Sequence, residues 1–396
     1  MNNISLYIHI PFCLSKCTYC DFFSKPQTGC INPVPDEYIK ALCSELKFRL
    51  GQNKEKIIST VYIGGGTPSL LNENQIEQIC NTIKEFKAIE NPEFTFELNP
   101  DDITEALLKV LWKNGITRLS VGVQSFSDSV LKSIHRRADS ACIYKALDCI
   151  KEFWPGKMSA DLICGLPYET KDSMLQALKN LICYDIPHIS FYSLCVEEET
   201  PLGKQINEGK VPYNQDFSDD LWIKGRDFLL QNGYEQYEIS NFCKKENECK
   251  HNMTYWSHKD YIGAGAGACG TLYNSDGTGL RINNTQNIQK YISFWNNFSF
   301  TSCADILQLP QETENLDKET SIFEYFMMGL RTKKGISAKE YMQIFGTSMS
   351  QKVIDIFNKW EKKGLCNCKD NARYSLNAEG MLFLNSLLQE IAKTEW

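Results

Sequence analysis

The chain has no long apolar run and no surplus of basic residues. None of its segments approaches the roughly 18 consecutive apolar residues that cross a bilayer, so the sequence predicts a protein that is not embedded in a membrane. The opening residues, Met-Asn-Asn-Ile-Ser, lack the basic and then apolar segments of a secretory signal peptide. Lysine and arginine number 42 against 49 acidic residues, and the net charge of −7 does not favour a nucleic-acid partner.

The 17 cysteines do not fit a disulfide framework, because their number is odd and no secretion signal is visible. They indicate instead a reducing, cytoplasmic compartment with mostly free thiols. At 396 residues, of which 42% are hydrophobic, the chain is long enough for two or three domains with ordinary cores.

Three of the cysteines, Cys13, Cys17 and Cys20, lie close together directly after the apolar run 5–12. Three thiolates hold three irons of a [4Fe–4S] cluster and leave the fourth iron open to another ligand. A zinc site usually takes four nitrogen or sulfur ligands, and the next cysteine, Cys30, lies beyond a segment that contains proline and glycine. The spacing therefore predicts a cluster that takes part in chemistry, in preference to a zinc site or a disulfide knot.

The first half of the chain alternates short apolar runs with amphipathic stretches, which is the pattern of parallel βα units. The predicted strands are 5–10, 60–63, 93–97, 118–123, 159–163 and 188–193. The predicted helices between them are 36–50, 74–86, 104–113, 129–134, 142–153 and 171–183. Six such units predict an α/β fold with a partial (β/α)6 barrel, whose site lies at the C-terminal ends of the strands.

Beyond residue 213 the pattern changes, and we expect two further parts. A helix at 216–231 and a strand at 234–240 precede an aromatic- and glycine-rich stretch at 241–273, and the polar segment 310–318 is predicted to be a linker. The last part is predicted to be a mostly helical, winged-helix-like domain. Its predicted helices are 322–330, 338–345, 351–363 and 378–391, and its short hairpin is 364–375. The predicted divisions are 1–240, 241–310 and 311–396.

Glycines and polar side chains follow several predicted strands. The run Gly64-Gly65-Gly66-Thr67 lets a ligand approach the backbone, and it lacks the Lys-Ser/Thr ending of a phosphate loop. A tight turn between a strand and a helix explains the glycines equally well.

Four further side chains are predicted to share the same rim of the barrel. The carboxylate of Glu97 suits two adjacent ribose hydroxyls, and Arg136 suits a ligand carboxylate. Gln124 follows one strand and Asp161 lies near the end of another. Each of them alone is more often a structural or solvated residue, so the prediction depends on the whole group.

Together these motifs resemble the radical S-adenosylmethionine (SAM) superfamily, and within it the branch of oxygen-independent coproporphyrinogen III oxidases and HemW haem chaperones. The resemblance covers nearly the whole chain. It rests on Tyr7-Ile-His-Ile-Pro-Phe-Cys13 with Cys17 and Cys20, on segments 64–68, 97–100, 122–126, 161–167, 188–192 and 234–242, and on His251-Asn-Met-Thr-Tyr-Trp256.

The resemblance implies that Cys13, Cys17 and Cys20 bind the [4Fe–4S] cluster and that the open iron takes the amino and carboxylate groups of S-adenosylmethionine. It assigns the S-adenosylmethionine pocket to Tyr7, Gly65, Gly66, Thr67, Glu97, Gln124, Arg136 and Asp161. In this superfamily a reduced cluster cleaves the sulfonium bond and gives a 5′-deoxyadenosyl radical, while the protein positions and shields the reactants.

Three features favour a haem chaperone over an oxidase. The oxidases carry another cysteine two residues after the third cluster cysteine, where this chain has Phe22, and they extend well upstream of the cluster loop. The stretch from His251 to Trp256 resembles the HNxxYW motif of the chaperones, whose histidine is linked to haem binding. The resemblance thus implies a protein that carries haem as its cargo and does not turn over a substrate. The alternative is radical decarboxylation of coproporphyrinogen III in porphyrin biosynthesis.

The sequence does not decide which residue is the axial ligand of the haem iron, and it does not identify the partner proteins. A haem iron accepts histidine or cysteine, so Cys249 and Cys269 are weaker candidates beside His251, which would otherwise be a buried, hydrogen-bonded histidine. The resemblance implies a haem-requiring membrane enzyme as recipient and no nucleic-acid partner. It does not define the oligomeric state, and a dimer linked through the cluster is compatible with it.

Overall fold

Six parallel strands form the centre of the computed structural model, which describes residues 3–30, 32–299, 308–369 and 373–394. Each strand pairs with the next one along the chain. They are β1 (Asn3–Ile10), β4 (Ile57–Gly65), β5 (Ala88–Leu98), β6 (Arg118–Gln124), β7 (Lys157–Cys164) and β8 (His188–Ser193). The six strands predicted from the sequence are confirmed.

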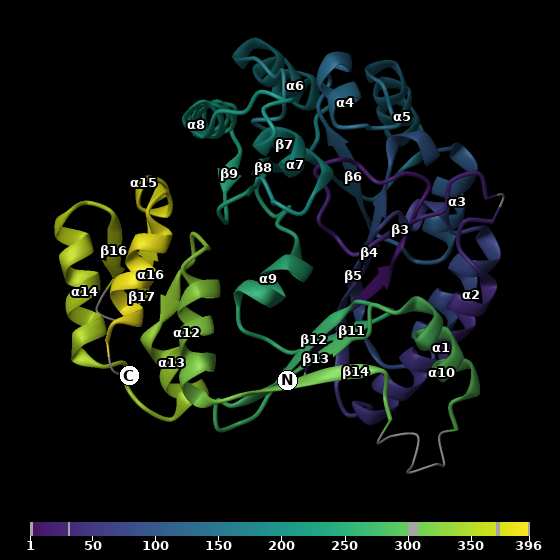
Figure 1. Cartoon of the computed structure of the whole chain (residues 1–396). Coiled ribbons are helices and arrows are strands. Elements are labelled where there is room, and N and C mark those ends of the chain that lie inside the picture. Colours follow the sequence, from purple (N-terminus) through teal and green to yellow (C-terminus); the bar gives the residue numbers. More distant parts are fainter. Residues whose placement is uncertain (1–2, 31, 300–307, 370–372, 395–396) are drawn as a thin grey trace.

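Helices connect these strands and lie along the outer side of the sheet (Figure 1). They are α1 (Asp36–Gln52), α2 (Glu73–Lys84), α3 (Glu105–Lys113), α4 (Asp128–Ser133), α5 (Ser140–Phe153) and α6 (Lys171–Cys183), with 3-10 turns at Pro68–Leu70 and Pro100–Asp102. Polar caps fix where several helices begin: Asn72 and Gln75 form a capping box at α2, and Asp139 accepts the N–H of Cys142 at α5. In the described part of the chain β1 and β8 do not pair with each other, so the barrel is partial.

Four strands extend the sheet beyond β1. Strand β11 (Tyr261–Ala264) runs parallel to β1, and β12 (Cys269–Tyr273), β13 (Gly279–Asn284) and β14 (Gln311–Leu316) follow in antiparallel order. The carboxylate of Glu45 on α1, fully buried, holds this extension in place. It accepts hydrogen bonds from Arg49, Asn284, the N–H of Gly265 and Tyr291 on α10 (Ile288–Asn297). Because all of its partners are donors, the buried charge is well compensated.

The prediction of a linker at 310–318 is wrong, because most of that segment is β14. Its sequence, Gln-Glu-Thr-Glu-Asn-Leu, is exposed at four consecutive positions at the edge of the sheet. A strand exposed on both faces needs no apolar residue at alternate positions, so it lacks the pattern by which a strand is recognised.

At the opposite edge of the sheet, β10 (Asn241–Cys243) pairs antiparallel with β8 and with the outermost strand, β9 (Glu235–Gln236). The strand predicted at 234–240 is therefore much shorter than expected. Helices α7 (Pro201–Asn207) and α8 (Gln215–Gln231) precede these strands, and α9 (Lys250–Trp256) follows them. A short parallel pair, β2 (Phe12–Cys13) and β3 (Lys25–Pro26), brackets the loop that carries Cys17 and Cys20.

The C-terminal part has its own hydrophobic core (lower left in Figure 1). Helices α12 (Lys318–Gly329), α13 (Ala338–Phe345) and α14 (Gln351–Lys362) pack with a three-stranded sheet of β15 (Ile336–Ser337), β17 (Arg373–Leu376) and β16 (Cys366–Lys369). The predicted last helix is divided into α15 (Ala378–Met381) and α16 (Leu384–Ala392). Helices with a small hairpin agree with the predicted winged-helix-like domain, although residues 370–372 of the hairpin lie outside the described residues. The domain divisions at 240 and 310 stay a prediction.

No helix in the described part of the chain combines the length and the apolar composition that a membrane crossing requires.

Candidate cluster and cofactor site

A cavity of about 500 Å³ lies inside the partial barrel and reaches from the cysteine loop to α9. Strand β6 shows how the sequence builds it. Leu119, Val121 and Val123 are fully buried in the core, whereas the alternate residues Arg118, Ser120, Gly122 and Gln124 line the cavity. One strand thus contributes polar groups along the whole depth of the cavity.

The three predicted cluster ligands, Cys13, Cys17 and Cys20, all line this cavity and are free thiols. Thr67 Oγ1 donates to Cys13 Sγ at 3.3 Å, and Arg136 Nη1 donates to Cys17 Sγ at 3.7 Å. Among the described residues no three acidic, histidine or cysteine side chains surround a single metal ion. Three thiols with neighbouring donors fit a [4Fe–4S] group.

The glycine run connects this loop to Glu97. Gly65 has φ +115°, which other residues rarely adopt, and its N–H donates to Glu97 Oε2 at 3.0 Å. The N–H of Gly66 donates to the carbonyl oxygen of Ile10 at 2.9 Å, just before the cysteine loop. Gly65, Gly66 and Thr67 all line the cavity. Both N–H groups are therefore used inside the protein, which favours the tight turn of the two alternatives, and the approach of a ligand to this backbone stays a prediction.

Gly66→Ala is expected to lower both the melting temperature and the iron bound per chain. A Cβ atom there would lie 2.7 Å from the carbonyl oxygen of Phe12 and 2.9 Å from that of Ile10, and backbone atoms cannot rotate away. Such overpacking costs about 1–3 kcal/mol. Thermal unfolding and iron analysis measure the two effects. Gly51→Ala is the matched control, because nothing lies within 4 Å of the added atom. Equal values for the two variants would contradict the expectation.

The carboxylates of Glu97, on β5, and Asp161, on β7, both line the cavity. Tyr62, which the sequence did not single out, donates to Glu97 Oε1 at 2.7 Å. Burial raises the pKa of Glu97 to about 7, and the nearby Asp161 adds to this, while the bonds from Tyr62 and Gly65 oppose it. Burial likewise raises the pKa of Asp161, to which Ser120 donates at 3.0 Å. Buried carboxylates whose pKa is raised in this way are typical of binding sites.

Gln124 and Arg136 lie at the rim with the cysteines. Gln124 ends β6 with φ 67°, a strained conformation for a residue with a side chain. Arg136 Nη2 donates to Asn99 Oδ1 at 2.8 Å and to the carbonyl oxygen of Gly122, while its buried Nε has no partner among the described residues. An unused donor beside the cysteines suits a ligand carboxylate.

Tyr7 does not line the cavity. Its hydroxyl is bonded to His9 Nδ1 at 2.8 Å, and the other ring nitrogen of His9 is bonded to the carbonyl oxygen of Phe23 at 2.9 Å. Tyr7 therefore supports the segment that follows the cysteines, and its contact with S-adenosylmethionine stays a prediction.

His251 lies at the other end of the barrel, in α9, with 1% of its surface exposed. Its Nδ1 lies 2.7 Å from Thr60 Oγ1 and its Nε2 lies 2.7 Å from the hydroxyl of Tyr255. Burial lowers the pKa of His251 to about 3, so its ring is neutral. Its neighbours Cys249 and Asn252 line the cavity, although His251 itself does not. Cys269 lies elsewhere, 3.9 Å from the hydroxyl of Tyr261.

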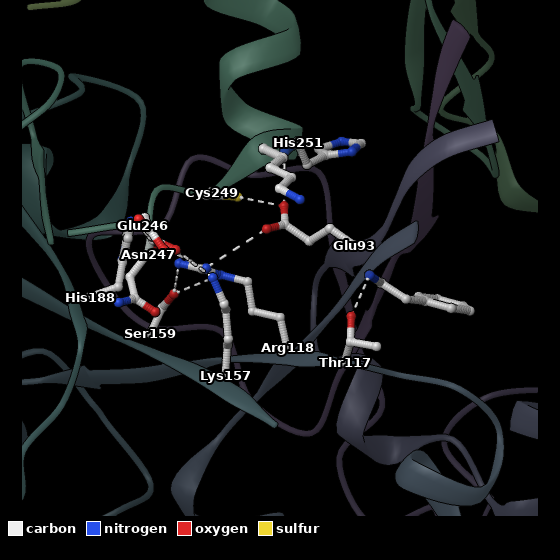
Figure 2. A network of polar contacts seen from close by, with 12 residues as sticks. Glu93, Thr117, Arg118, Lys157, Ser159, His188, Glu246, Asn247, Cys249 and His251 are labelled. Carbon is white, nitrogen blue, oxygen red and sulfur yellow. Dashed lines mark hydrogen bonds and ion pairs between the residues drawn. The ribbon is translucent and has the colours of Figure 1, made fainter. Parts of the chain in front are cut away.

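A polar network, which the sequence did not reveal, fixes the start of α9 on the barrel (Figure 2). Glu93 Oε1 accepts the N–H of His251 at 2.9 Å and lies 3.5 Å from Cys249 Sγ. Glu93 Oε2 lies 3.8 Å from Arg118, which also donates to Ser159. The figure shows the ring of His251 turned away from Arg118. Arg118 could have been identified from the sequence, because it is a charged residue in a strand that was predicted to be buried.

The other end of α9 contacts the C-terminal part of the chain. Arg331 lies over the ring of Trp256, 4.5 Å from its centroid, and forms an ion pair of 3.4 Å with the fully buried Glu238. The last residue of the HNxxYW stretch therefore anchors α9 to the C-terminal part through a cation–π contact.

Comparison with known proteins agrees with these features. The description "Radical SAM superfamily" matches residues 7–181, and "HemN C-terminal domain" matches residues 316–383. The protein named "Heme chaperone HemW" from Lactococcus lactis subsp. lactis is 34% identical over 351 residues, which are 88% of this chain and 86% of that one. Proteins with the same name are 32% identical in Bacillus subtilis, over 97% of both chains, and 31% identical in Escherichia coli, over 98% and 97%.

The chain belongs to the HemW family. The superfamily to which HemW proteins belong implies an iron–sulfur cluster and S-adenosylmethionine as cofactors. The solved structure of Escherichia coli coproporphyrinogen III oxidase (HemN), a radical SAM enzyme, matches with a TM-score of 0.82 at 21% identity, over 99% of this chain and 90% of that one. At this identity the match shows the fold, and it confirms the predicted α/β architecture with a C-terminal helical domain.

Proposed function

We propose that this protein is a cytoplasmic haem chaperone that binds a [4Fe–4S] cluster, S-adenosylmethionine and haem, and delivers the haem to a haem-requiring membrane enzyme. The observation that carries the proposal is one cavity with Cys13, Cys17 and Cys20 at one end and Cys249 and Asn252, on either side of His251, at the other. The names of the curated relatives support haem as the cargo.

The residues of the rim fit the cofactors by their chemistry. The three cysteines would hold the cluster, and Arg136 has a free donor for the carboxylate of S-adenosylmethionine. Gly65, Gly66 and Thr67 would border its methionyl part, Glu97 would accept the ribose hydroxyls, and Gln124 and Asp161 would complete the pocket. When bound, the cluster and S-adenosylmethionine supply one-electron chemistry. The chain's own contribution is to orient them and to keep water out of the barrel.

The decisive experiment is an anaerobic assay of the reconstituted protein with S-adenosylmethionine, a reductant and coproporphyrinogen III, followed by haem titration of the same sample. Haem binding without a decarboxylated product supports the chaperone. Formation of protoporphyrinogen would make the protein an oxidase, and the exposed Phe22 at the mouth of the cavity would then be a tolerated variation.

His251→Ala is expected to weaken haem retention and to leave the cluster intact, because His251 lies at the end of the barrel opposite the cysteines. Haem absorption after gel filtration and iron–sulfur absorption of the same preparation measure both effects. His135→Ala, which removes an exposed histidine, is the control. Unchanged haem binding in the His251 variant would show that another residue binds the haem iron. Cys249, which lines the cavity, would be the next candidate.

A further inference from the structure

A chain of buried hydroxyl groups leads away from the ring of His251. Thr60 Oγ1 lies 2.7 Å from His251 Nδ1, and it donates its own hydrogen bond to Ser5 Oγ at 2.7 Å. Ser5 Oγ lies 2.8 Å from Thr254 Oγ1, and Thr254 donates to the carbonyl oxygen of Lys250 at 3.3 Å. The three hydroxyl residues are at most 8% exposed, so bulk water does not replace any of these partners.

The direction of this chain determines where the hydrogen of His251 lies. A hydroxyl group has one hydrogen, and that of Thr60 is used in the bond to Ser5. The short contact between Thr60 and Nδ1 must therefore be an N–H bond donated by His251. A buried imidazole without an acidic group on either nitrogen is neutral, so it has only one N–H. Nε2 is then left as an acceptor, and the hydroxyl of Tyr255 donates to it.

We propose that Ser5, Thr60 and Thr254 are positioning residues, which hold His251 as its Nδ1–H tautomer so that Nε2 is the nitrogen that binds the haem iron. This inference rests on the proposed function and adds the ligating atom and the groups that orient it. Metal-binding histidines generally donate their other N–H to a fixed acceptor, and loss of that acceptor weakens metal binding. Here the acceptor is Thr60.

The positions of the hydroxyls in the fold explain why the chain is rigid. Ser5 on β1 and Thr60 on β4 are paired neighbours in the sheet, and Thr254 lies one turn after Lys250 in α9. The chain therefore joins two central strands to the helix that carries His251. Tyr255 covers Nε2 from the last turn of the same helix, with its ring edge-on to His251 at 5.1 Å. Because His251 is 1% exposed and does not line the cavity, haem binding requires that this hydroxyl leaves Nε2 and that the side chains packed around the ring move apart.

The tautomer can be measured without haem. In full-length protein labelled with ¹⁵N-histidine, long-range ¹H–¹⁵N spectra distinguish a protonated from an unprotonated ring nitrogen. The chain has only five histidines, and the His251→Ala variant identifies the signals of His251. We expect a protonated Nδ1 and an unprotonated Nε2. The reverse pattern would overturn the proposal.

Thr60→Val keeps the shape of the side chain and removes the acceptor. We expect the hydrogen to move to Nε2, where it bonds to Tyr255, and haem affinity to fall about 10- to 100-fold. Thr60→Ser should keep the tautomer and the affinity. Thr82→Val is the control, since this buried threonine donates to the carbonyl oxygen of Gln78 in its own helix and does not contact His251. Haem affinity of Thr60→Val equal to that of the wild type would overturn the proposal.

Ser5→Ala tests the same idea without touching a partner of His251. Once Ser5 is lost, Thr60 is free to donate to Nδ1, and the tautomer should reverse. Tyr255→Phe removes the hydroxyl that donates to Nε2 and should bind haem at least as tightly as the wild type. A weaker affinity would contradict the assignment of Nε2. If the wild type binds no haem, the proposed function fails, whereas the spectra still decide the tautomer.

Discussion

Cys17→Ala is expected to abolish the iron–sulfur absorption of anaerobically reconstituted protein. Cys17 lies in the loop between β2 and β3 and lines the cavity with Cys13 and Cys20, and two cysteines leave two irons of the cluster without a protein ligand. Absorption spectra and iron and sulfide analysis measure the loss.

Cys30→Ala is the matched control for this experiment. Cys30 is an exposed thiol in the same N-terminal region, and its contact in the structure is with Gln27. It should retain the full cluster. A complete four-iron cluster in Cys17→Ala would refute the ligand assignment, and loss of the cluster in both variants would show that the loop itself is sensitive to any change.

Glu97→Gln is expected to weaken S-adenosylmethionine binding and to stabilise the cofactor-free protein at pH 8. The folded protein raises the pKa of Glu97 from 4.5 to about 7, chiefly through burial. The folded state therefore holds this proton more tightly than the unfolded state. The resulting stabilisation is complete below pH 4.5 and is lost as the pH rises through 7. At pH 8 the buried charge lowers the free energy of unfolding by on the order of 3 kcal/mol.

Denaturant unfolding of Glu97→Gln and of the wild type at pH 5 and pH 8 tests this prediction. At pH 5 the protonated carboxyl accepts through one oxygen, as the amide does, whereas at pH 8 the carboxylate accepts from both Tyr62 and Gly65. The pKa of about 7 already includes this gain, so the comparison of the two pH values still measures the net cost of the buried charge. The gain at pH 8 relative to pH 5 is the expected result. Glu85→Gln, at an exposed carboxylate, should show no such difference. A pH-independent effect in both variants would contradict the raised pKa.

The sequence predicted the barrel well because buried parallel strands have strong apolar patterns. All six central strands and the helices that connect them were identified from these patterns. The prediction failed where apolar burial does not decide the structure. Strand β14 is exposed and polar, and most of the segment 234–240 is irregular because only Glu235 and Gln236 pair with β10. In both places tertiary contacts determine the conformation.

The structure brings part of the predicted site together, although its role stays a prediction. Motif spacing placed Cys13, Cys17, Cys20, Glu97 and Arg136 near one rim, and all of them line the cavity. The contacts of His251 with Thr60 and Glu93 could not be predicted, because these residues come from strands far from it in the sequence. Thr60, Glu93 and Ser5 lie in apolar runs and carry no motif of their own. Only the pairing of β1, β4 and β5 and the packing of α9 bring them to the histidine.

The polar composition of the outermost strands also affects how molecules of this protein meet one another. Among the described residues the large sheet ends in β14 on one side and in β9 on the other. An unprotected edge can pair with the edge of a second molecule and so start aggregation. Strand β14 places Glu312 and Glu314 in its exposed stretch, and β9 has only two residues, one of them Glu235. Charge repulsion on one edge and shortness on the other should keep the molecules apart at high concentration.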